Sequence, residues 1–270
     1  MNINRKILVV LSVAIMIGVF IAAYFPHDQY TNKNSRLRVG SGQDITGVLL
    51  EEISKTALNL GDEQIFSSNN DESEKASLID TYMFVDCCAN ASQWALISQD
   101  IEAGFFCSHT ALHMVNQNHD FEIYGPVVMN AEVVASCEAP EYITSIGVPQ
   151  KRRHLQELIA ENYPGVTNTV EMNPASISYA IKSGQVNGAI IDVSHMAQLD
   201  TYTFYDLTDT DYVSFCLVVR KDIIETKSFQ DFVYYYNETV TRLSEEGALA
   251  SLLSNGTATL PNVRVKLLHL

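Results

Sequence analysis

The five cysteines carry the most reactive side chains in this sequence. Cys87 and Cys88 are adjacent, and the pair, like Cys107 and Cys137, follows an apolar run typical of a strand. We therefore expect three or four sulfur atoms to lie close together. Three interpretations stay open: a disulfide of Cys87 or Cys88 with Cys107, capture of a thiophilic metal or a sulfur- or selenium-containing compound, and buried thiols without a chemical role. A structural zinc site is not expected, because the sequence has no CxxC pair.

Polar residues at the expected starts of helices form a second group of candidates. Ser108 and Ser194 can offer hydroxyl groups, although simple helix capping also explains them. Arg152 belongs to a basic cluster at a helix start, where a cation is poorly placed for the helix dipole, so contact with an anionic group competes with a solvated turn. We predict no catalytic residue, no cofactor and no metal ligand. The predicted ligand-binding residues are Gln43, Asp44, Cys87, Cys88, Asn90, Cys107, Ser108, His109, Cys137, Gln150, Arg152, Ser194 and His195.

Alternating strands and helices must position these side chains. Short apolar runs bounded by turn residues predict strands, and segments with helical spacing lie between them. This order predicts an α/β fold with largely parallel sheets. Asn90 is expected to cap the helix 90–98, and Trp94 on that helix is expected in the core. The stretches 101–109 and 186–195 both end in Ser-His, which suggests two similar lobes.

The N-terminal segment predicts export. Ile7–Phe25 carries no charged residue, and Arg5 and Lys6 precede it. Its length suits the ~30 Å hydrocarbon core of a membrane, and the preceding positive charge favours an extracytoplasmic location for the residues after the segment. We expect an uncleaved anchor at 1–25 rather than a cleaved signal peptide, with a polar tether at 26–36.

The net charge of the chain limits its partners. The formal charge of −15 argues against nucleic acid or an anionic membrane surface, because both would repel the protein. The residues after the apolar segment suffice for one large domain or two lobes.

Several stretches resemble the substrate-binding proteins of ABC transporters, in the two-lobed type that imports sulfonates and other small organic anions. The clearest are "IGVPQKRRHLQELIAENYPGV" and "ISYAIKSGQVNGAIIDVSHMAQL" in 146–199, with further likeness at 37–58, 99–110 and 229–255. The resemblance implies a periplasmic-binding-protein-like fold of type 2. Lobe 1 would comprise 37–125 and 209–270, and lobe 2 would comprise 126–208. The crossings between them would fall near Tyr124–Val127 and Phe204–Tyr212.

The resemblance also implies a function. A small solute, anionic or thiophilic, would bind in the cleft between the lobes and pass to an ABC permease with its ATPase, and the chain itself would not be an enzyme. The alternative is an extracytoplasmic thiol-dependent redox protein or enzyme that uses Cys87, Cys88 or Cys107.

Overall fold

A computed structural model describes residues 36–65, 79–254 and 264–270 of this chain. The predicted anchor at Ile7–Phe25 and nearly all of the predicted tether lie outside the described residues. Within the described ranges, no helix combines the length and the apolar character that crossing a membrane requires.

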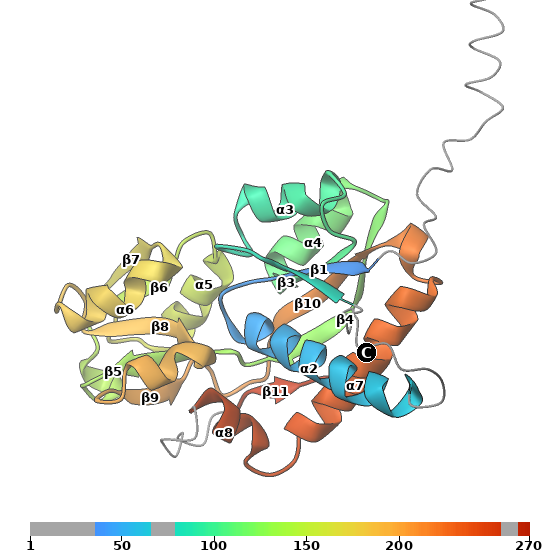
Figure 1. The fold of residues 1–270 in the computed structure, drawn as a ribbon. Helices are drawn as coiled ribbons and strands as arrows, with labels where there is room; N and C mark the ends of the chain where they lie inside the picture. The colour runs from blue at the N-terminus through green and yellow to red at the C-terminus, as the bar shows by residue number, and fades with distance from the viewer. Residues whose placement is uncertain (1–35, 66–78, 255–263) are drawn as a thin grey trace, which may run out of the picture. The chain divides into compact units, whose positions relative to one another are not determined.

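The described strands form two sheets (Figure 1). The first sheet has the order β11-β4-β10-β3-β1-β2, with β1 (Leu37–Ser41), β2 (Ile79–Met83), β3 (Ala103–Cys107), β4 (Phe121–Met129), β10 (Val213–Arg220) and β11 (Lys266–Leu267). The second has the order β7-β6-β8-β5-β9, with β5 (Glu132–Ser136), β6 (Ser145–Pro149), β7 (Asn168–Met172), β8 (Gly188–Asp192) and β9 (Thr203–Asp206). We call each sheet with its helices a lobe.

Both sheets are mixed, so the prediction of largely parallel sheets is wrong. β1 is parallel to β2 and β3, and β6 is parallel to β7 and β8. β10 is antiparallel to β3 and β4, and β5 is antiparallel to β8 and β9. The chain enters β5 and β10 from the other lobe rather than through a helical crossover, so these strands are not constrained to run parallel to their neighbours.

Helices cover both faces of each sheet. On the first sheet, α2 (Ile45–Ile65) and α7 (Lys227–Leu243) lie on one face, and α3 (Asn90–Ile97) and α4 (Ser108–Gln117) lie on the other (Figure 1). The second lobe contains α5 (Arg153–Asn162), α6 (Pro174–Lys182) and the 3₁₀ helices η1 (Pro140–Tyr142) and η2 (Val193–Gln198). The first lobe also contains η3 (Lys221–Ile223) and α8 (Ala248–Leu253), and α8 contacts η2 of the second lobe.

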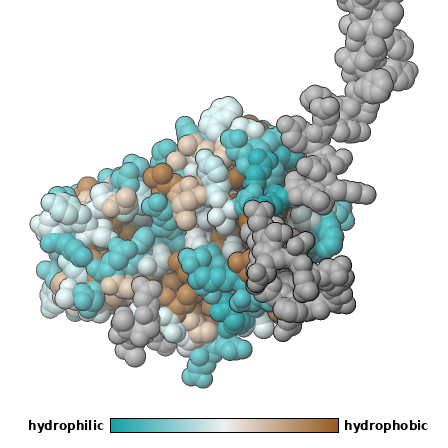
Figure 2. All heavy atoms as spheres, in the orientation of Figure 1, coloured by the Kyte–Doolittle hydropathy of each residue, from teal (hydrophilic) through white to brown (hydrophobic). Residues whose placement is uncertain are grey.

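The core follows from the apolar runs of the central strands. β3 is buried along its whole length, with Phe105 and Phe106 fully buried, as expected for a strand covered on both faces. Polar side chains cover much of the outer face seen in Figure 2. Trp94 is 62% exposed, so its predicted place in the core is wrong. It occupies the outer side of α3, whose buried positions are Ser92, Ala95 and Leu96.

The chain crosses between the lobes at 130–131 and at 207–212. The first crossing lies beyond the predicted Tyr124–Val127, because β4 continues through Gly125 and Pro126 with register shifts opposite β10, where a proline is tolerated. Asn130 adopts φ 54°, which asparagine tolerates better than most residues. Its Oδ1 accepts a hydrogen bond from Tyr212 N (3.1 Å), and its Nδ2 donates one to Asp211 Oδ1 (2.9 Å). One side chain thus joins both crossings.

Candidate functional site

A small pocket lies between the two lobes. Its volume is about 50 Å³, which leaves room for only a few water molecules. Both lobes line it, with Gln43, Asp44, Val85, Asp86 and Cys87 from the first and Glu132, Pro149, Arg152, Pro174, Ile177, Ser178, Ile190, Ile191, Asp192 and His195 from the second.

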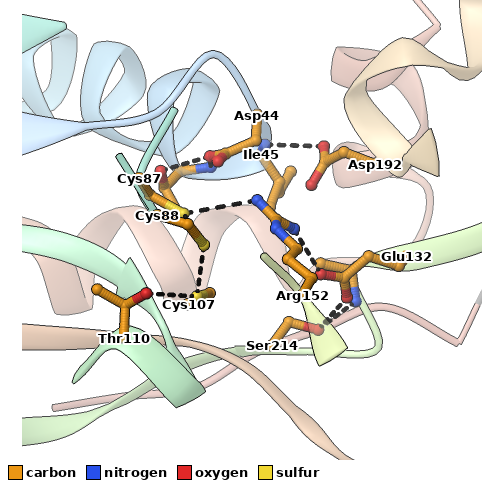
Figure 3. A network of polar contacts seen from close by, with 12 residues as sticks. Asp44, Ile45, Cys87, Cys88, Cys107, Thr110, Glu132, Arg152, Asp192 and Ser214 are labelled. Atoms are coloured by element: carbon orange, nitrogen blue, oxygen red, sulfur yellow. Dashed lines mark hydrogen bonds and ion pairs between the residues drawn. The ribbon is translucent and has the colours of Figure 1, made fainter. Parts of the chain in front are cut away.

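Arg152 joins the lobes at the centre of this region (Figure 3). The preceding Lys151 takes a left-handed conformation (φ 63°) between β6 and α5, and the Arg152 side chain is only 7% exposed. Its Nη1 donates to Glu132 Oε1 at 3.0 Å, and its Nη2 lies 3.5 Å from Cys87 Sγ in the other lobe. The guanidinium carbon also lies 5.5 Å from the centre of the Phe215 ring, within the range of a cation–π interaction.

Glu132 was not predicted from the sequence. Its Oε2 accepts hydrogen bonds from Ser214 Oγ (2.6 Å) and Tyr212 Oη (3.1 Å), while Oε1 pairs with Arg152. The buried guanidinium is therefore neutralised by a buried carboxylate. The available signal was a single acidic residue in the otherwise apolar run that forms β5, since a buried charge requires a partner.

Three thiols lie behind Arg152 on the first lobe. Cys87 Sγ is 3.7 Å from Cys88 Sγ, Cys88 Sγ is 3.0 Å from Cys107 Sγ, and all three lie within 4.8 Å of one another. Thr110 Oγ1 is 3.2 Å from Cys107 Sγ. The disulfide considered from the sequence is not formed, because all five cysteines are free thiols and the shortest of these distances exceeds a sulfur–sulfur bond by about 1 Å.

The thiols differ in acidity. Hydrogen bonds from Cys87 and Cys88 hold the pKa of Cys107 well below its usual value, against the effect of its burial. Hydrogen bonding to Cys107, together with desolvation, raises the pKa of Cys87 well above its usual value. Cys107 is therefore the most acidic of the three thiols, and the Arg152 guanidinium lies beside the cluster, 3.5 Å from Cys87 Sγ.

Two carboxyl groups lie on the other side of the pocket. Asp192 Oδ1 accepts from Ile45 N of the opposite lobe at 2.9 Å and from Ser194 N and Oγ at 2.9 and 2.6 Å. Asp44 Oδ1 accepts from Thr46 N at 2.9 Å. Burial, and then the charge of Asp44, raise the pKa of Asp192 to about 8, and burial also raises the pKa of Asp44. Asp192 Oδ2 is buried and has no hydrogen-bond partner among the described residues.

Histidines add two further contacts between the lobes. His195 Nε2 lies 3.0 Å from the carbonyl oxygen of Gln43, and the His109 ring stacks on His154 with a centroid distance of 6.5 Å. With the contacts of Arg152 and Asp192, these interactions connect the two lobes across the pocket.

Five of the predicted residues line the pocket, and Cys88, Cys107, His109 and Ser194 take part in the contacts around it. The other four have no part in either. Asn90 is exposed, and Ala89 rather than Asn90 occupies the N-cap of α3. Ser108 is the first residue of α4 after the N-cap Cys107, so it is not the cap either. Gln150 is half-buried and pairs through its backbone N with Met172 O. Cys137 is exposed and is not part of the thiol cluster.

The direction of β5 explains why Cys137 lies elsewhere. Because β5 is antiparallel to β8, Glu132 pairs with Asp192 and Ser136 with Gly188. The first residue of β5 therefore reaches the pocket, and Cys137, which comes after its last residue, lies at the opposite edge. The prediction assumed that every strand presents its carboxyl end to the ligand, as parallel strands do.

Comparison with solved structures identifies the architecture. This chain is similar to the ligand-binding component of an ABC-type import system from Staphylococcus aureus, solved with zinc bound. The alignment covers 83% of this chain and 80% of that protein, with 12% sequence identity and a TM-score of 0.61. The fold is that of ABC-type substrate-binding proteins. The alkanesulfonate-binding protein SsuA from Xanthomonas axonopodis pv. citri, bound to MOPS, matches with 15% identity, 85% and 86% coverage and a TM-score of 0.57.

Other substrate-binding folds with different named ligands match equally well. A putative methionine-binding lipoprotein from Bacillus subtilis has 10% identity, 86% and 98% coverage and a TM-score of 0.57. No protein-family model matches the sequence, and the search of curated proteins found no match. The substrate-binding fold accounts for the two lobes and the pocket between them, and fold alone does not determine function.

Proposed function

We propose that this chain is the extracytoplasmic solute-binding component of an ABC importer. The observation that carries the proposal is the interlobe pocket, which both lobes line and across which Arg152, Asp192 and His195 contact the opposite lobe. Two lobes joined by two short crossings can open and close by a hinge motion around a ligand. The captured solute, anionic or thiophilic, would then be delivered to a permease and its ATPase.

We assign the elements through β4 and from β10 onward to one lobe and β5 to β9 to the other, in a type 2 arrangement. The boundary expected at 125–126 would divide β4, so we place it at 130–131. The position of β10 between β3 and β4 supports this assignment, because the strand that returns from the second lobe is inserted into the first sheet. The pocket of about 50 Å³ supports an opening motion, since separation of the lobes would enlarge it for a larger solute.

We further propose that Ile7–Phe25 anchors the protein on the extracytoplasmic side of the cell membrane. The absence of charge in this segment and the basic pair before it support the proposal. The anchored protein would remain beside its permease.

Thermal unfolding of the full chain with a panel of sulfonates, carboxylates, thiols and soft metal ions tests the proposal. A true ligand raises the melting temperature increasingly as its concentration exceeds Kd. We expect Arg152→Met to abolish that shift and Arg153→Met, which changes the exposed neighbouring residue, to preserve it. A panel without any ligand-dependent shift contradicts the proposal.

A thiol-dependent redox function is the second candidate. The 3.0 Å distance between Cys88 and Cys107 favours it, because these sulfurs can form a disulfide after a small movement. Against it, none of the described histidines forms a hydrogen bond with the three thiols, and the thiols are at most 4% exposed. Turnover of a disulfide substrate that Cys107→Ser abolishes would favour this function over solute capture.

A further inference from the structure

We propose that Cys87, Cys88 and Cys107 together bind a trivalent soft metalloid of the arsenite class through three sulfur–metalloid bonds. The inference rests on the proposed function for its role in transport and names the class of solute. The three Sγ atoms lie within 4.8 Å of one another. A pyramidal trivalent centre bonded to three sulfurs at about 2.3 Å, the length of a typical metal–thiolate bond, holds them roughly 3.5 Å apart. Two of the three separations are already 3.7 and 3.0 Å, so small side-chain rotations suffice to form the site.

The number of donors selects among soft ions. In the described part of the chain, the cluster holds three sulfur ligands and no fourth cysteine, histidine or carboxylate. Structural zinc sites use four protein ligands, zinc sites with three protein ligands need a water as the fourth, and calcium or magnesium requires oxygen donors. A trivalent metalloid is satisfied by three thiolates and needs no further donor.

The charges around the cluster also favour a trivalent centre. A trivalent centre with three thiolates is neutral, whereas a divalent ion leaves one negative charge and a monovalent ion leaves two. Arg152 is the neighbouring cation, and its charge is already balanced by Glu132 at 3.0 Å. Burial of an unbalanced charge is costly, so the neutral complex suits this site best.

The binding step balances without an oxidant. An arsenite molecule, As(OH)₃, reacts with three thiols to give a tris-thiolate complex and three waters. Three S–H and three As–O bonds break, three As–S and three O–H bonds form, and arsenic keeps its oxidation state. Oxidation of Cys88 and Cys107 to a disulfide would remove two donors, so the reduced protein is the competent form.

Access to the thiols couples the site to the hinge. Cys87 lines the interlobe pocket, while Cys88 and Cys107 lie behind it at 4% and 0% exposure. A ligand must therefore enter while the lobes are apart. On closure, Arg152 from the second lobe comes to 3.5 Å from Cys87 Sγ, so the site is covered by the other lobe.

The test uses the full chain, reduced with a phosphine, and sodium arsenite as the probe. Native mass spectrometry should show a gain of one arsenic less three hydrogens, and X-ray absorption should show three sulfur neighbours and no oxygen. Cys87→Ser, Cys88→Ser and Cys107→Ser should each weaken binding about a hundredfold or more, since loss of an outer-shell partner alone costs 10–100-fold. The matched controls Cys137→Ser and Cys216→Ser should bind as the wild type does.

Several outcomes would overturn the assignment. The assignment is wrong if arsenite does not bind, or if binding is lost only in the Cys137→Ser control. It is also wrong if Cu(I) or Zn²⁺ binds under conditions where arsenite does not. Small-angle scattering separates this inference from the proposed function. Arsenite bound through three sulfurs without compaction of the protein supports the site and contradicts solute capture by closure. Compaction with another solute, and no arsenite binding, supports solute capture and overturns the metalloid site.

Discussion

The two sides of the interlobe pocket combine polar groups in opposite ways. On one side, the charge of Arg152 is balanced by Glu132, and the guanidinium closes against the thiol cluster. On the other, Asp44 and Asp192 are two acids in a buried space, and burial raises the pKa of both. The first side depends on opposite charges, and the second depends on bound protons. Under the proposed function, the first side would set ligand chemistry, and the second would make closure sensitive to pH.

Removal of Glu132 should have the largest effect. Glu132→Ala leaves Arg152 buried without its counter-charge, and we expect the free energy of unfolding to fall by about 3–5 kcal/mol. Glu157→Ala removes the partner of the exposed neighbour Arg153 and should cost at most about 0.5 kcal/mol. Urea unfolding of both variants measures the difference. Addition of Arg152→Met to Glu132→Ala should recover part of the loss, and equal losses in the two single variants would contradict the ion-pair account.

The thiol side can be probed by its chemical protection. The exposed Cys137 should react first with a small alkylating reagent, while Cys87, Cys88 and Cys107 should react roughly 10–1000-fold more slowly, as expected when reaction requires a minor open state. Peptide mass spectrometry over time gives the rates, and the denatured chain serves as the control. Similar rates at all four positions in the native protein would show that the lobes do not protect the cluster.

The carboxyl side should respond to pH. The pKa of Asp192 rises from an ordinary 3.8 to about 8, so between these values the closed protein holds a proton that the unfolded chain has released. Stability from this group is therefore lost as pH rises through the window, by at most about 1.4 kcal/mol per pH unit. The contribution of Asp192 is isolated by measuring, as a function of pH, the difference in unfolding free energy between the wild type and Asp192→Asn. If the wild type instead gained stability relative to Asp192→Asn as pH rises, the raised pKa of Asp192 would be contradicted.

The smallest expected effect concerns His195 at the edge of the pocket. His195→Ala removes the contact with the Gln43 carbonyl, and a hydrogen bond of this kind contributes about 1 kcal/mol, or about fivefold in an equilibrium. Alkylation of Cys87 should accelerate by that factor if the bond favours closure. His113→Ala, at an exposed position on α4, should leave the rate unchanged.

The sequence predicted the apolar elements well and the polar partners less well. The runs that form β3 and β8 and the amphipathic helix α5 were expected, because burial imposes a regular pattern on neighbouring residues. The gathering of Cys87, Cys88 and Cys107 followed from their positions after strands. Glu132 was missed, and Cys137 was wrongly expected beside the other thiols, because local sequence does not fix the direction of β5. That direction is set by the crossing from the other lobe, a feature of the tertiary structure.

Asn130 has a kinetic consequence. Its side chain bonds to Asp211 and Tyr212 on the returning segment, so the two crossings cannot twist independently. Relaxation between open and closed forms should then follow a single exponential for probes placed on either lobe. Asn130→Ala, which frees the segments from one another, should introduce a second, faster phase in the same stopped-flow record.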